Sequence, residues 1–163
     1  MHNVDLVAKA KGIIERILYI TIATVSKDGQ PWNSPVYSAF DENYNFYWAS
    51  DQNGQHSKNI AENNKVFLVI YDSTAPEGTG EGVYVQAKAY VLTGEDEIRN
   101  ALKHLDGRVG KQKDPATRVL EFQGDSPRRV YKAVPEKFWM NDDGDVNGNF
   151  IDIRTEVDLL TDK

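Results

Sequence analysis

Residues 20–71 decide the fold, and they read ITIATVSKDGQPWNSPVYSAFDENYNFYWASDQNGQHSKNIAENNKVFLVIY. β-Branched residues dominate a strand predicted at 19–25. The Asp28-Gly29 pair that follows predicts a hairpin, because glycine supplies the positive φ of a tight turn. The further elements predicted here are a strand at 32–40, an acidic turn, a strand at 46–50, a helix at 57–63 and a strand at 66–71. The last strand is apolar throughout, which predicts burial on both of its faces.

The flanking sequence extends this pattern. An amphipathic first helix places Leu6, Ala10, Ile13 and Ile17 on one face, and Asn3 or Asp5 can cap it. The next elements predicted are a Gly-rich loop at 73–82, a strand at 83–93 and a helix that starts at Glu95 and buries Ile98, Leu102 and Leu105. A short helix after Pro115, a strand at 128–139 interrupted at Pro135 and a strand at 149–157 complete the chain. About seven strands in antiparallel hairpins, with four helices, indicate a small β-barrel and not a parallel sheet.

Composition narrows the class of protein. The chain has 163 residues, 40% of them hydrophobic, which fits a single domain, 1–163, with its own core. Its 19 Lys and Arg against 25 Asp and Glu give a net charge of −6, so we expect no nucleic-acid partner. The sequence has no Cys, which excludes disulfides and thiolate catalysis. No apolar run approaches ~20 residues and no signal pattern is present, so we expect no membrane partner and a cytoplasmic location.

A cofactor phosphate can be held where the helix at 57–63 opens. Backbone N–H groups of a first helical turn lack partners inside the helix, and the helix dipole favours an anion there. The side chains that can add donors are Gln55, His56, Ser57 and Lys58. The alternatives are that Ser57 is only an N-cap, that Lys58 is a solvated charge and that His56 is ordinary surface.

No other motif nominates chemistry. Residues 143–148 read DGDVNG and reproduce the start of a calcium loop, but the twelfth position is Arg154 and the flanks read as strands. We therefore predict a hairpin turn there and no metal site. The three His residues have no ligand spacing, and the chain has no nucleophile elbow, P-loop or GxGxxG motif, so no catalytic residue is assigned.

The order of these elements resembles the FMN-binding split-barrel superfamily, the family of pyridoxamine 5′-phosphate oxidase and its smaller relatives. The resemblance runs from the first helix to Arg154. Its motifs are the 20–25 strand with Asp28-Gly29-Gln30-Pro31, then Ser34-Pro35-Val36, Phe46-Tyr47-Trp48-Ala49-Ser50, His56-Ser57-Lys58-Asn59-Ile60 before Val66-Phe67-Leu68, and Lys137-Phe138-Trp139. The resemblance implies a β-rich α+β fold, an antiparallel split β-barrel of about six or seven strands with peripheral helices. It also implies FMN held at the interface of a homodimer.

Site residues follow from the same resemblance. The strands that flank the flavin correspond to Asn33, Ser34, Pro35 and Val36 and to Trp48, Ala49 and Ser50, which can offer backbone groups to the ring's pyrimidine edge. The family has Arg and Lys at the phosphate-binding positions occupied here by Gln55 and His56. Trp139 sits where an aromatic reaches the flavin, and Arg154 resembles a remaining Arg of the enzyme. Phe150 and Asp152 replace its Arg-x-His substrate grip, so pyridoxamine 5′-phosphate oxidase activity itself is not expected.

Two classes of function remain. One is a flavin-dependent oxidoreductase of a small-molecule substrate, with NAD(P)H as a candidate reductant. The alternative is a non-catalytic protein that binds or stores flavin, a deazaflavin or haem. Either class is expected as a homodimer that buries about 2,000 Å² or more, because Pro31 and Pro35 mark an edge strand. The aromatic residues also exceed what one small core needs, and they include Tyr37, Tyr47, Trp48, Tyr84, Phe138 and Trp139.

Overall fold

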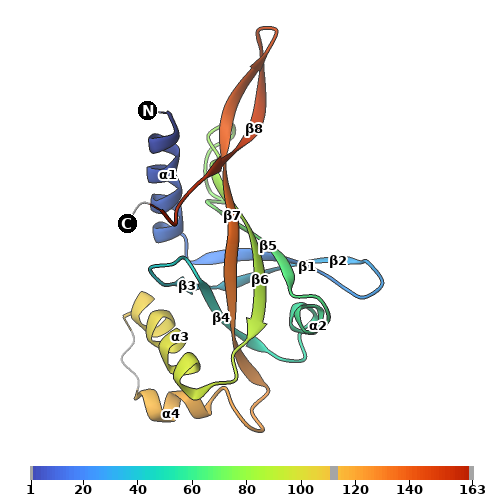
Figure 1. Ribbon diagram of the computed structural model, residues 1–163, viewed down its shortest axis with the longest axis vertical. Helices are drawn as coiled ribbons and strands as arrows, with labels where there is room; N and C mark the ends of the chain where they lie inside the picture. Colours follow the sequence, from blue (N-terminus) through green and yellow to red (C-terminus); the bar gives the residue numbers. More distant parts are fainter. Residues whose placement is uncertain (1, 111–113, 162–163) are drawn as a thin grey trace.

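One antiparallel sheet organises the chain in the computed structural model (Figure 1). The structure describes residues 2–110 and 114–161. Within them the elements are α1 (His2–Arg16), β1 (Tyr19–Val25), β2 (Pro31–Tyr37), β3 (Ala39–Phe40), β4 (Phe46–Asp51), α2 (Gln55–Glu62), β5 (Lys65–Tyr71), β6 (Gly82–Val91), α3 (Glu95–Arg108), α4 (Pro115–Leu120), β7 (Arg128–Val146) and β8 (Asn149–Val157). The predicted β-rich α+β class, an antiparallel split barrel with peripheral helices, is confirmed. Eight strands are described where about seven were expected, because the 32–40 segment is divided at Ser38.

The strand order makes the sheet curl. Its hydrogen-bonded sequence is β2-β1-β5-β6-β7-β4-β3, with β8 added on β7. β2 and β3 lie at opposite ends of this order, yet only Ser38 separates them in the chain. The sheet must therefore bend round until its two ends meet, which forms a barrel. Within the described residues, no ladder joins β2 to β4, so the barrel stays open along that line.

Residues with positive φ form the turns of two hairpins. Gly29 has φ +87° in the β1–β2 turn, as predicted. Asn147 and Gly148, with φ of 55° and 77°, make the two-residue turn between β7 and β8. Figure 1 shows this hairpin projecting beyond the barrel. The calcium-like motif thus forms a strand end and a turn, and the described residues contain no group of three His, Asp or Glu side chains placed to hold a metal ion.

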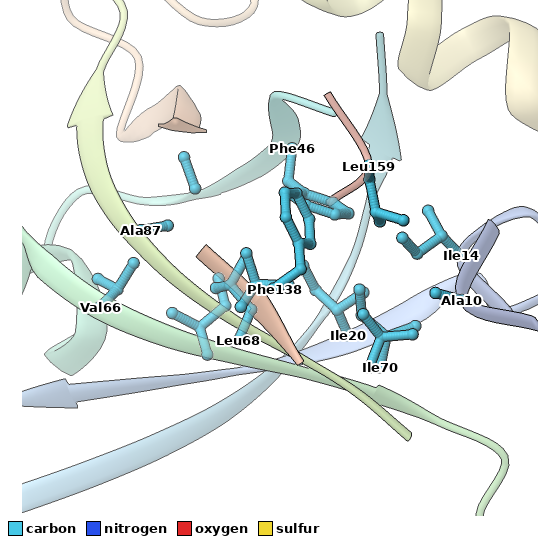
Figure 2. Close-up of a cluster of buried hydrophobic side chains, with 14 of the residues drawn as sticks. Ala10, Ile14, Ile20, Phe46, Val66, Leu68, Ile70, Ala87, Phe138 and Leu159 are labelled. Atoms are coloured by element: carbon cyan, nitrogen blue, oxygen red, sulfur yellow. The ribbon is translucent and has the colours of Figure 1, made fainter. Parts of the chain in front are cut away.

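Two apolar clusters stabilise the fold. The first fills the barrel, where Ala10 and Ile14 of α1 close one end over Ile20, Ile70 and their neighbours (Figure 2). The second lies between the sheet and the helices α3 and α4, and its members include Tyr47, Ile98, Leu102, Leu105, Phe122 and Val130. β4 separates the two clusters, because Phe46 and Trp48 face the first while Tyr47 faces the second. No helix of the described residues is both long and apolar enough to cross a membrane.

Three local predictions were wrong. β5 is not buried on both faces: it alternates, and Phe67 and Tyr71 are 38% and 46% exposed. The helices α3 and α4 cover the outer side of the sheet at β3 and β4, but no layer of the described residues covers it at β5. α1 begins at His2, so Asn3 and Asp5 lie within the helix and do not cap it. β7 continues through Pro135, which lies opposite Ala87, and a register shift at the next residue, Glu136, adjusts the ladder beside the residue that cannot donate.

Candidate functional site

The opening of the barrel leaves two strand edges free. Among the described strands β2 pairs only with β1, and beyond Tyr47 the strand β4 pairs only with β7, because β3 begins at Ala39, the residue opposite Tyr47. Backbone N–H and C=O groups along these edges have no ladder partner among the described strands. We call this open line between β2 and β4 the seam. A flat ring with hydrogen-bonding atoms along one edge can pair with such backbone groups.

The first turn of α2 is fixed beside the seam by side-chain hydrogen bonds. His56 Nε2 lies 2.9 Å from Ser50 Oγ, and Ser57 Oγ donates to the Asp51 carbonyl at 2.8 Å. Buried Asn59 donates to Thr24 Oγ1 at 3.0 Å, which joins the same helix to β1. The start of α2 is therefore held against both walls of the barrel opening.

The helix start has no side-chain cap. Gly54 is the N-cap residue, two residues earlier than the helix predicted at 57–63 would require. Ser57 is consequently inside the helix, and its hydroxyl faces the Asp51 carbonyl, so the alternative that Ser57 is an N-cap is wrong. Gly54 has no side-chain oxygen, and its carbonyl accepts from the N–H of Lys58, so the N–H groups of the preceding helical residues are available to an anion.

The charge at this helix start is small. Burial alone lowers the pKa of His56, so its imidazole is neutral at neutral pH. Gln55 is engaged with Asn59 at 2.8 Å. Lys58 is exposed and is the permanent cation of the turn. A phosphate here would be held by backbone N–H groups, by one N–H of His56 and by the ammonium of Lys58.

The seven strand residues predicted to flank a flavin divide between the two faces of the sheet. Asn33 and Pro35 are exposed on the outer face, whereas Val36 belongs to the barrel core. Ser34 is half-buried and accepts a hydrogen bond from Trp32 Nε1 at 3.0 Å. In β4, Ala49 and Ser50 are half-buried.

Trp48 is fully buried and stacks on Tyr131, with 5.5 Å between the ring centroids. Its side chain is therefore part of the core, and only its backbone can reach the seam. Trp48 Nε1 is also buried without a hydrogen-bond partner among the described residues. A buried donor without a partner costs about 1–3 kcal/mol, so this indole is a weak point of the core unless a further group reaches it.

Trp139 and Arg154 lie together on the outer face of the sheet, away from the seam. Trp139 stacks on Phe67 at 6.1 Å and pairs across the ladder with Tyr84. The Arg154 guanidinium lies 4.5 Å from the centre of the Tyr84 ring. We call this row of Phe67, Tyr84, Trp139 and Arg154 the aromatic row. Sequence reasoning missed Phe67, although strict alternation through 66–71 would have placed it on the outer face.

The aromatic row and the seam are far apart in one chain. Pro35 lies opposite Thr21, Thr21 opposite Val69, Val69 opposite Tyr84 and Tyr84 opposite Trp139. Along the curved sheet, four strand spacings of ~4.8 Å separate Pro35 from Trp139. On the other side of the barrel, Trp139 lies about 20 Å along β7 beyond Ala133, where the pairing of β7 with β4 ends. The predicted site residues therefore form two half-sites that one chain does not bring together.

The hairpin β7–β8 carries the stretch that replaces an Arg-x-His motif. Phe150 is 70% exposed there. Asp152 accepts hydrogen bonds from Arg154 at 2.7 Å and from Asn141 at 3.2 Å, and both partners hold the pKa of its carboxyl below the usual value. An ionised carboxylate at this place disfavours a phosphate.

An antiparallel barrel that is open between two strands and carries a helix start at the opening is a split barrel. A family model described as pyridoxamine 5′-phosphate oxidase matches residues 6–142. The chain therefore belongs to the pyridoxamine 5′-phosphate oxidase-like family of FMN-binding split barrels. No curated protein matches the chain in sequence.

Solved structures show the same fold. The chain is similar to ChuZ of Campylobacter jejuni, with a TM-score of 0.70 and 14% identity over 94% of this chain and 63% of that one. It is similar to HutZ, the haem storage protein of Vibrio cholerae, with a TM-score of 0.65 and 15% identity over 80% of this chain and 90% of that one. It is also similar to a putative pyridoxamine 5′-phosphate oxidase of Listeria innocua, with a TM-score of 0.59 and 20% identity over 82% of this chain and 95% of that one. At these identities the likeness establishes the fold alone.

Proposed function

We propose that this protein is an FMN-binding flavoprotein that works as a homodimer and oxidises or reduces a small molecule. The observation that supports it best is the division of the site into two half-sites. The seam with α2 offers backbone groups and a phosphate grip, whereas the aromatic row offers flat side chains and a cation. A two-fold axis can place the aromatic row of one copy against the seam of the other, since such an interface uses the same surfaces twice.

The outer face of the sheet has the character of an interface. Phe67, Tyr71 and Tyr19 are 38%, 46% and 63% exposed on this side of the barrel, next to half-buried Val69 and Trp139. Contiguous exposed aromatic surface on a sheet is unfavourable in water and marks a binding surface. The occupant that also completes the seam is a second copy of this chain.

The residues at the seam fit FMN in kind. The isoalloxazine ring needs donors and acceptors along its pyrimidine edge, and the free edges of β2 and β4 carry both. Asn33, Ser34, Pro35 and Val36 contribute backbone on one side, and Trp48, Ala49 and Ser50 contribute it on the other. The phosphate would contact Gln55, His56, Ser57 and Lys58.

The chemistry would come from the cofactor. When bound, FMN accepts and returns hydride or single electrons, and the chain's own residues bind it, orient it and exclude water. Trp139 and Arg154 of the partner subunit would cover the ring. Among the described residues of the site, no side chain has a role of its own in proton transfer. The proposed activity is therefore that of an oxidoreductase of a small-molecule substrate, with NAD(P)H as the candidate reductant. Its proposed location is the cytoplasm.

Three measurements on the purified full chain test this proposal. The protein loaded with FMN should show a flavin absorption spectrum and sediment as a dimer at micromolar concentration. Steady oxidation of NAD(P)H by the loaded protein separates a catalyst from a storage protein. A monomer, or a chain that binds neither FMN nor riboflavin at micromolar concentration, would contradict the proposal.

Haem is the second candidate ligand. Structures described as a haem storage protein of Vibrio cholerae and a haem binding protein of Mycobacterium smegmatis share this fold. In this chain the half-buried, neutral His56 is the imidazole at the seam that could ligate iron. A haemin titration decides it: a Soret shift that His56→Ala abolishes favours haem, and an unchanged spectrum with tight FMN binding favours the flavin.

A further inference from the structure

A cleft of about 720 Å³ lies between α2 and the adjoining ends of β6 and β7. The β1–β2 hairpin flanks α2 through Gln55 and Asn59 and does not line this cleft. The apolar part of its lining is formed by Ile60, Ala61, Ala89, Tyr90, Val91 and Tyr131, and polar or charged side chains complete it. A volume in this range and walls of this kind are typical of small-molecule sites.

The cleft is positively charged in an acidic protein. Two cations, Lys58 and Arg129, line it against one carboxylate, Glu62. The Arg129 guanidinium donates to the carbonyls of Gly124 at 2.9 Å and Arg128 at 2.8 Å. Carbonyl groups fix the guanidinium in place without cancelling its charge.

The charge of Arg129 acts inside the cleft. Arg129 and Tyr131 both line the cleft, and because they are two residues apart on β7 their side chains lie on the same face of the strand. Lys58 approaches from α2 and has no ion-pair partner in the part of the chain that the structure describes. An anion between Lys58 and Arg129 would receive charge-assisted hydrogen bonds.

We propose that this cleft is a binding site for a flat, apolar small molecule that carries one acidic group. The apolar walls would desolvate the body of such a molecule, and Lys58 and Arg129 would bind its carboxylate. Glu62 is one carboxylate against two cations, so the lining keeps a net positive charge and favours an anionic ligand over a cationic one. Ser57 and Lys58 are shared with the proposed phosphate grip, so the acidic group and the FMN phosphate would compete for the Lys58 ammonium.

Titration of the ¹⁵N-labelled full chain with 2-naphthoate, followed by NMR, tests the site directly. We expect saturable shifts at the amides of Ala61, Ala89 and Val91. The neutral analogue 2-naphthylmethanol should bind the same residues at least about 10-fold more weakly, the ratio that loss of one charge-assisted hydrogen bond produces. Shifts confined to the outer face of the sheet, or no saturation with either probe, would overturn the proposal.

Variants separate the charge from the fold. Lys58→Gln should lower the affinity for 2-naphthoate about 10-fold and leave the affinity for 2-naphthylmethanol unchanged. Lys27→Gln, on the β1–β2 hairpin, should change neither affinity. Ala61 is exposed on α2, so Ala61→Phe should fold and fill the cleft, abolishing both probes. Because Ala61 is not a seam residue, the Ala61→Phe variant should bind FMN with unchanged affinity. This result distinguishes the cleft from the flavin site. Equal naphthoate affinity in the two Lys→Gln variants would refute the site.

Discussion

His56 Nε2 and Ser50 Oγ lie 2.9 Å apart, and this contact joins the first turn of α2 to the end of β4. A neutral imidazole has one N–H, so His56 can either donate to Ser50 or keep its proton for another acceptor. A phosphate that accepts from Nδ1 would select the tautomer in which Ser50 Oγ donates to Nε2, whereas without it Nε2 can donate to Ser50. The contact therefore ties the geometry of the seam to the charge of the ligand.

Loss of the phosphate grip should affect FMN and spare riboflavin. His56→Ala and Lys58→Ala are each expected to weaken FMN by about 10- to 150-fold, which is 1.5–3 kcal/mol for one charge-assisted hydrogen bond. Riboflavin has no phosphate, so its affinity should fall much less in these variants. Quenching of flavin fluorescence gives both affinities, with Lys27→Ala as a matched control. Equal losses for the two flavins would show that these residues support the fold.

FMN affinity should rise as the pH falls from about 8 towards 6. Burial lowers the pKa of His56 in the free protein, and a bound phosphate dianion would raise it, so binding takes up a proton between the two values. Below about pH 6 the phosphate itself protonates and the gain stops. Dissociation constants measured across this range should lose their slope in His56→Gln. A slope that persists in that variant would assign the proton elsewhere.

A charge on the aromatic row should separate the subunits. Phe67 is partly exposed and stacks on Trp139, so Phe67→Lys would place a cation within the proposed interface. Sedimentation is expected to show a monomer and a parallel loss of FMN binding. Leu120→Lys, at a 70% exposed position of α4, is the control and should leave the dimer intact. A dimeric Phe67→Lys variant would exclude this face as the interface.

Asp41 should contribute stability that acid removes. Burial would raise the pKa of its carboxyl, but hydrogen bonds from Asn45 and from the Tyr47 hydroxyl at 2.7 Å outweigh that effect and lower it. Its contribution is complete above the unfolded value of about 3.9 and disappears as the pH falls through the lower folded value. Asp41→Asn should cost about 1–3 kcal/mol in urea unfolding at pH 7.

The same variant provides its own control. At a pH below the folded pKa of Asp41, the unfolding free energies of the two proteins should converge, because the wild-type carboxyl is then protonated as well. A difference that stays constant with pH would assign the cost to packing instead of charge.

Arg108 should hold α1 against α3. Its guanidinium donates to the carbonyls of Ile14 at 2.8 Å and Ile17 at 2.7 Å, at the C-terminal end of α1 where a cation is favourable. Arg108→Met is expected to lower the unfolding free energy by about 1.5–3 kcal/mol, since the carbonyls lose a charged donor. Arg99→Met, on the solvent side of the same helix, should change it by less than about 0.5 kcal/mol. Similar costs at both positions would remove the special role of Arg108.

Local signals predicted the elements well. The strands at 19–25 and 149–157 have the predicted bounds, because β-branched residues and turn glycines act over a few neighbours. The misassigned segments depend on distant partners. Pro135 does not end β7, because a register shift against β6 accommodates it. Phe67 is exposed because the outer side of β5 has no covering layer in this chain.

The candidate site was less predictable for the same reason. Sequence motifs identified a helix start close to Gln55, two residues too late, and the strands beside it, and these do lie together. Whether Trp48 faces the core or the seam depends on which sheet face β4 turns inward, and that is set by its pairing with β7. The distance between Pro35 and Trp139 results from the order of five strands, which no local pattern contains.

The separation of the two half-sites makes cofactor binding and subunit association one linked equilibrium. If each flavin contacts the seam of one copy and the aromatic row of the other, dilution that separates the copies must release the flavin, and added flavin must tighten the pair by the same free energy. Two chains damaged in different half-sites, such as His56→Ala and Trp139→Ala, would then regain one intact site of the two when they are mixed. Random pairing makes half of the dimers mixed, so about a quarter of all flavin sites should regain full affinity, which a site contained within one chain could not do.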